Sequence, residues 1–81
     1  MITITEIQEF NAGDFRIAQQ WVEILSPQAE ILTESAFRGI ITSPCSHLFF
    51  AREGETPAGM LTLGYYTSPT GMKAWIEDVV V

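Results

Sequence analysis

The stretch Lys73-Ala-Trp-Ile-Glu-Asp-Val-Val-Val81 decides the fold of this chain. It is rich in β-branched and aromatic residues and contains neither Gly nor Pro, which predicts a β-strand. Two adjacent acids, Glu77 and Asp78, interrupt the apolar run. An apolar strand at the end of a chain has to be paired or covered, because an exposed apolar edge promotes aggregation. We therefore expect the chain to be part of something larger that joins it at this strand.

The two acids are expected to point to opposite faces of that strand, because side chains alternate with a period of two. They are therefore not expected to form a carboxylate dyad, and at most one of them faces any given site. The residues expected on the face of Asp78 are Ala74, Ile76 and Val80. Those expected on the face of Glu77 are Trp75, Val79 and Val81. A carboxylate with apolar neighbours can act as a general base near neutral pH. The alternative is that one acid points to solvent and the other caps a loop or pairs with an arginine.

Length and composition allow one small domain with an apolar surplus. The chain has 81 residues, of which 47% are hydrophobic. A domain of this size buries only about 60 to 65% of its unfolded surface, so we expect an exposed apolar surface and a partner. The formal charge of −6 argues against nucleic acid, which requires basic clusters, and favours cationic ligands such as amines.

The single cysteine, Cys45, excludes an intramolecular disulfide and favours an intracellular protein. No apolar run approaches the length of a membrane span, and the N-terminus does not resemble a signal peptide. We therefore expect a cytoplasmic protein with no membrane partner. Cys45 is expected to be buried and inert, and His47 to lie at a surface loop edge. No metal-ligand spacing occurs in the sequence, so no metal site is predicted.

The remaining chain reads as a strand, two helices and three strands. A strand starts at Ile2 and ends or bulges near Glu6. One helix covers residues 15–25 with Asp14 as its N-cap, and a second runs from the cap Thr33 to about Thr42. The later strands are expected at residues 47–53, 58–66 and 73–81.

This order predicts an α+β fold in which two helices pack on a sheet that ends in a three-stranded antiparallel meander. Glycines inside the 58–66 strand, Gly59 and Gly64, indicate bulges or a close backbone approach. The chain carries no internal repeat and no linker, so residues 1–81 are expected to form a single unit.

The run Ile76-Glu-Asp-Val-Val-Val81 resembles the fourth strand of the Gcn5-related N-acetyltransferase (GNAT) family of acyl-CoA N-acyltransferases. The preceding segments agree in order with that family: Thr33-Glu-Ser-Ala-Phe37, Leu48-Phe-Phe-Ala-Arg52 and Gly59-Met-Leu-Thr-Leu63. The resemblance covers the whole chain but only the N-terminal half of the family fold. It therefore implies a partial N-acetyltransferase-like domain over residues 1–81, without the acetyl-CoA pyrophosphate loop and the C-terminal half.

The resemblance further implies a function and a site. The parent reaction would be acetyl transfer from acetyl-CoA to a small-molecule primary amine. The backbone of Val79, Val80 and Val81 would lie along the pantetheine arm, with one amide polarising the thioester carbonyl. Glu77 or Asp78 would contact the amine or take its proton. Because the pyrophosphate loop is missing, we expect the isolated chain to be inactive.

A second interpretation belongs to another functional class. The chain would be a non-catalytic half-domain that assembles through its edge strand, residues 73–81, with the same strand of a second copy. In a third, the strand would join a separate chain that supplies the C-terminal half.

Overall fold

The computed structural model describes all residues from Met1 to Val81. Its elements in chain order are β1 (Ile2–Glu6), α1 (Ala12–Leu25), α2 (Glu34–Thr42), β2 (Ser46–Glu53), β3 (Thr56–Ser68) and β4 (Gly71–Val80). The predicted α+β order of strand, helix, helix and three strands is confirmed.

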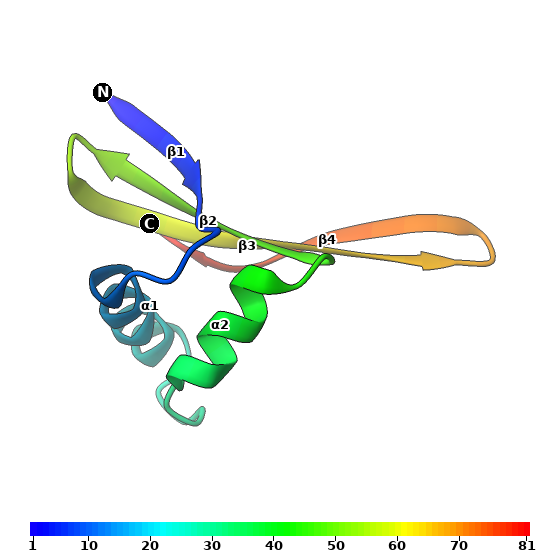
Figure 1. The fold of residues 1–81 in the computed structure, drawn as a ribbon, viewed down its shortest axis with the longest axis horizontal. Coiled ribbons are helices and arrows are strands. Elements are labelled where there is room, and N and C mark those ends of the chain that lie inside the picture. Colours follow the sequence, from blue (N-terminus) through cyan, green and yellow to red (C-terminus); the bar gives the residue numbers. More distant parts are fainter.

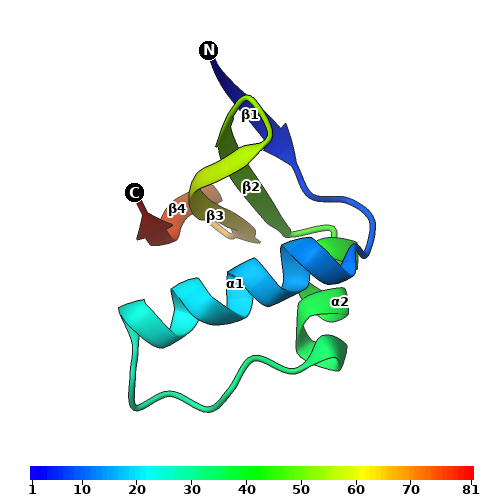
Figure 2. The same cartoon turned by 90° about the vertical axis from the view of Figure 1, so that its left-hand side faces the viewer.

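The four strands form one antiparallel sheet in the order β1-β2-β3-β4, so β1 and β4 are its two edges. Both helices lie on the same side of this sheet, as the two views in Figures 1 and 2 show. No helix or strand covers the other face of the sheet, which we call the open face. The fold is thus two layers with one sheet face uncovered.

Helix α1 starts earlier than predicted, and its cap is a different residue. Asn11 is the N-cap, and its side-chain oxygen accepts a hydrogen bond from the Asp14 amide at 3.0 Å. The prediction of Asp14 as cap is wrong because an asparagine three residues earlier satisfies the free helix amides equally well. Asp14 instead lies in the first helical turn and forms an ion pair with Arg52 of β2 at 2.7 Å. This contact ties the start of α1 to the sheet.

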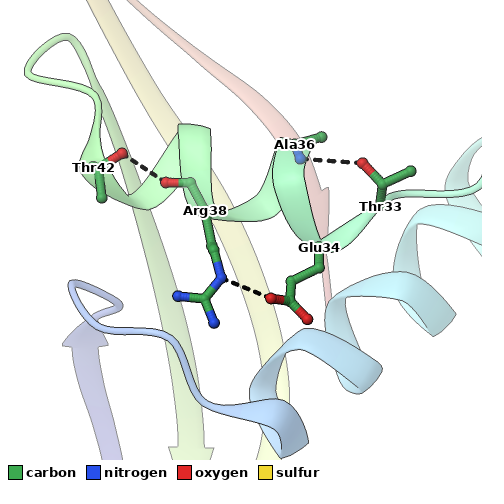
Figure 3. A network of polar contacts seen from close by, with 5 residues as sticks. All are labelled: Thr33, Glu34, Ala36, Arg38 and Thr42. Carbon is green, nitrogen blue, oxygen red and sulfur yellow. Dashed lines mark hydrogen bonds and ion pairs between the residues drawn. The ribbon is translucent and has the colours of Figure 1, made fainter.

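Helix α2 has the predicted cap, and Figure 3 shows its polar contacts. The Thr33 hydroxyl accepts a hydrogen bond from the Ala36 amide at 3.1 Å. Glu34 and Arg38, four residues apart on the same helix face, form an exposed ion pair at 2.8 Å. The Thr42 hydroxyl donates to the Arg38 carbonyl at the end of the helix. Each end of this short helix therefore has a local hydrogen bond with a threonine side chain.

The core lies between the helices and the sheet. Its six buried hydrophobic residues come from five places in the chain: Ile7, Ala18, Phe37, Leu48, Phe50 and Met60. Phe37 and Phe50 have no exposed surface at all. Trp21 of α1 meets Phe50 of β2 edge-on, with ring centroids 5.2 Å apart, so α1 and the sheet share one aromatic contact.

The β3–β4 hairpin is longer than predicted and extends past the rest of the molecule (Figure 1). Its strands are separated only by Pro69 and Thr70. The Ser68 hydroxyl closes this turn by donating to the Gly71 carbonyl at 3.1 Å. Because β2 begins opposite Gly64, the part of β3 beyond Tyr65 pairs with β4 alone. The outer half of the hairpin is therefore a two-stranded arm.

Candidate functional site

The edge strand β4 contains a β-bulge at the two acids. Thr62 of β3 lies opposite Glu77, and Met60 lies opposite Val80. One residue of β3 therefore lies opposite two residues of β4, which defines a bulge. Asp78 has a φ of 54°, in the left-handed region that aspartate tolerates better than most residues. The bulge is thus formed by the backbone of Asp78.

Because of the bulge, part of the prediction about which β4 side chains share a face of the sheet is wrong. Directly opposite residues share a face of the sheet, so Val80 lies on the face of Glu77 and not on that of Asp78. Val80 accordingly packs against the core on the helix side. Val79, which we assigned to the face of Glu77, lies on the open face with half of its surface exposed. The prediction failed because an extra residue shifts a period-two pattern by one position.

Glu77 lies on the helix side of the sheet beside an aromatic pair. Trp75 is opposite Gly64, and a Cβ on that glycine would meet two adjacent indole ring carbons at 2.6 and 2.7 Å. The indole therefore rests on the glycine, so Gly64 marks a close approach of the Trp75 side chain of β4. Tyr66 adds a second ring, with centroids 5.5 Å apart. The sequence alone did not identify this Trp75–Tyr66 pair as part of a site.

The predicted cofactor-binding residues Val79, Val80 and Val81 stay together at the end of β4. Val81 lies just beyond the strand and is fully exposed, whereas Val80 is partly buried. Gly59 of β3 lies under this segment, because a Cβ there would overlap the Val80 carbonyl oxygen and approach the Val81 Cα to 3.5 Å. The backbone of the three valines is thus held close to β3 and lies at the sheet edge.

The open face carries an apolar hollow of about 310 Å³ next to the three valines. Its lining includes Ile2, Ile4, Phe49, Ala51, Leu61 and Val79. Ile2, Ile4 and Val79 are each more than half exposed. The predicted exposed apolar surface is therefore present, and it lies on the face away from the helices.

Two further side chains lie differently from their prediction. Cys45 is exposed, not buried, because it belongs to the turn that precedes β2. His47 lies within β2 and is half-buried, where its Nδ1 is 2.6 Å from a Glu6 carboxylate oxygen. Its ring stacks on Tyr65, whose hydroxyl donates to the Pro44 carbonyl. This cluster connects β1, β2 and β3 and explains the position of the histidine.

No group of three or more His, Cys, Asp or Glu side chains comes together where it could hold a metal ion. None of the helices combines the length and the apolar character that crossing a membrane requires.

Comparisons with known proteins give one informative similarity. No protein-family model matches the chain, and none of the curated proteins matches it either. Among solved structures, the chain is similar to a protein described as "Putative acetyltransferase from Agrobacterium tumefaciens str. C58". The TM-score is 0.77 and the sequence identity is 24%. The match covers 96% of this chain and 57% of that chain, so the chain spans little more than half the length of the protein it resembles. The chain therefore has the fold of part of an acetyltransferase-like structure.

Proposed function

We propose that this chain is the N-terminal portion of an acetyl-CoA-dependent N-acetyltransferase of the GNAT type, cytoplasmic, with a small-molecule primary amine as acceptor. The observation that carries the proposal is the bulge at Asp78 on the edge strand, directly after Glu77. A bulge leaves one residue outside the strand ladder and re-aims the neighbouring backbone, which is why bulges recur next to active sites. The fold similarity to an acetyltransferase-like structure supports the same function.

The bulge fits the needs of a thioester substrate. The carbonyl of a thioester becomes an oxyanion as the amine attacks, before the C–S bond breaks and CoA leaves as the thiolate, and a fixed backbone amide stabilises that charge. Because β4 is an edge strand, its outer amides have no partner strand in this chain. We assign the pantetheine arm of acetyl-CoA to the backbone of Val79, Val80 and Val81, and the polarising amide to one of these residues.

The two acids receive different roles in this proposal. Glu77 is the proton acceptor, because it lies on the regular strand just before the bulge and shares its face with the apolar side chains of Trp75 and Val80. An amine has to lose a proton before it attacks a carbonyl, and a carboxylate in reach of the ammonium can take that proton directly or through water. Asp78 contributes through its left-handed backbone, which creates the bulge, and its side chain is an additional contact for the amine.

The proposed domain is partial, with residues 1–81 forming one unit of it. The apolar hollow on the open face and the free edge of β4 are surfaces that further polypeptide would cover. The acetyl-CoA pyrophosphate would be held by that further polypeptide. We accordingly expect the 81-residue chain to bind acetyl-CoA weakly and not to turn it over.

Titration of the isotopically labelled chain with acetyl-CoA, followed in amide nitrogen–proton spectra, tests the proposal. We expect the largest shifts at residues 77–81, with an affinity in the millimolar range that corresponds to only about −3 to −4 kcal/mol. Acetyl transfer to amines should be undetectable in the same samples. Desulfo-CoA is the matched control, because it lacks the thioester and should shift the amides near the bulge less. Shifts that lie elsewhere, or that are absent at about 5 mM, would refute the assignment, since millimolar binding is detectable there.

The second candidate is a half-domain that assembles with a second copy through β4. The exposed apolar residues of that strand and of the open face, such as Ile76 and Val79, favour it. Sedimentation velocity separates the two candidates. A single species of twice the 9.0 kDa chain mass supports the assembly module, and a Lys in place of Ile76 should then return it to a monomer. A monomer, or a broad range of aggregates, argues against the module.

A further inference from the structure

The indole of Trp75 lies against Gly64 and remains partly exposed. Any side chain at Gly64 would collide with the ring. Tyr66 borders the indole at 5.5 Å, with the two ring planes inclined by 53°. Both rings remain exposed, Trp75 by 40% and Tyr66 by 52%. Among aromatic side chains, an accessible tryptophan ring is the best partner for an organic cation.

Glu77 lies two positions along the same strand, on the same face as Trp75. Side chains at such positions start about 6 to 7 Å apart. A cation above the indole would therefore have the Glu77 carboxylate as a close neighbour along the strand. The two ammonium groups of 1,4-diaminobutane are separated by a comparable distance, so this ligand can reach both groups at once.

The charges around this surface also favour a cation of limited length. Neither of the cation–π contacts within the chain involves Trp75 or Tyr66, so no side chain occupies their faces in that way. Lys73 lies on the same face as Trp75, two residues away on the side opposite Glu77, and directly opposite Tyr66. It disfavours a longer polycation that would continue along the strand in that direction. The whole chain carries a net charge of −6, which raises the local concentration of cations.

We infer that Trp75, seated on Gly64 and flanked by Tyr66 and Glu77, forms a binding surface for an aliphatic diamine. One ammonium lies over the indole, and the other lies at the Glu77 carboxylate. The inference rests on the proposed function, because it names the substrate class for the site at Glu77. It requires no acetyl-CoA, and it can be tested separately.

The test uses the fluorescence of Trp75. In a Trp21→Phe variant Trp75 is the only tryptophan, and its emission is followed during titration with 1,4-diaminobutane at constant ionic strength. We expect a saturable change, whereas 1,4-butanediol, which has the same length but no charge, should cause none. The indole Nε1–H signal of Trp75 in the unsubstituted chain gives the same readout if the Trp21→Phe variant does not fold.

Two variants and a matched control test which side chains bind the diamine. Glu77→Gln should weaken diamine binding by about threefold or more, because an exposed ion pair is removed. Glu55→Gln is the matched control, since it removes the same charge from the exposed β2–β3 turn and should leave binding unchanged. Gly64→Ala should displace the indole and weaken binding by a similar or larger factor. An equal effect of Glu77→Gln and Glu55→Gln, or an equal response to the diol, would overturn the inference.

The failure of this inference can be told apart from that of the proposed function. Amide shifts at residues 77–81 with acetyl-CoA, together with no response to the diamine, overturn only the diamine surface. A diamine response with no acetyl-CoA shifts leaves a cation-binding surface and removes the acetyltransferase proposal.

Discussion

Replacing Phe50 with alanine is expected to lower the free energy of unfolding by about 3 to 5 kcal/mol, the range typical of a buried phenylalanine. Phe50 has no exposed surface and lies opposite Met60, another core residue. Trp21 of α1 packs edge-on against its ring, and the Arg52 guanidinium lies 5.3 Å from its centroid. The cavity would therefore open at the contact that holds α1 on the sheet.

The effect should remove a large part of the stability of the chain. A chain of 81 residues is expected to be stable by only about 4 to 12 kcal/mol. Urea unfolding followed by circular dichroism measures the loss. Ile24→Ala on α1 is the matched control, because Ile24 is 71% exposed and its truncation should change the stability by less than about 0.5 kcal/mol. A Phe50→Ala variant as stable as Ile24→Ala would show that the core does not centre on β2.

The order of elements could be predicted because each is marked by local chemistry. Thr33 caps α2 as its sequence position predicts, and the proline-flanked segments end the helices. The cap of α1 was missed because Asn11 and Asp14 are both good caps three residues apart, and local preference does not choose between them. Tertiary contact decides, since Asp14 is engaged by Arg52 of β2.

The site could be predicted only in its residue types. Glu77 and Asp78 were identified as unusual acids in an apolar strand, but regular alternation placed Val80 on the wrong face. The signal for the bulge was present in Asp78 itself, because aspartate is rare in strands and tolerates the left-handed region. The contact between Trp75 and Gly64 depends on the pairing register between β3 and β4. The sequence of either strand alone does not determine that register.

Gly59→Ala is expected to lower the free energy of unfolding by about 2 to 3 kcal/mol and to disturb the bulge, as overpacking in a tight contact does. The new Cβ would overlap the Val80 carbonyl oxygen, which belongs to the backbone and cannot rotate away as a side chain would. The end of β4 would have to move off β3. In amide spectra the shifts should extend from Gly59 through residues 77–81.

Two other glycines make this prediction specific. Gly39→Ala in α2 meets nothing within 4 Å and should stabilise the chain by about 0.5 to 1 kcal/mol, because alanine is the better helix former. Gly64→Ala meets the Trp75 indole, a side chain that can rotate away, so its cost should stay below about 1.5 kcal/mol as for other tolerated core changes. Only Gly59→Ala should also abolish the acetyl-CoA shifts at Val79, Val80 and Val81. If the Gly59→Ala variant unfolds no more easily than Gly39→Ala, the end of β4 does not lie on Gly59. The proposal that the bulge is the thioester site would then lose this structural argument.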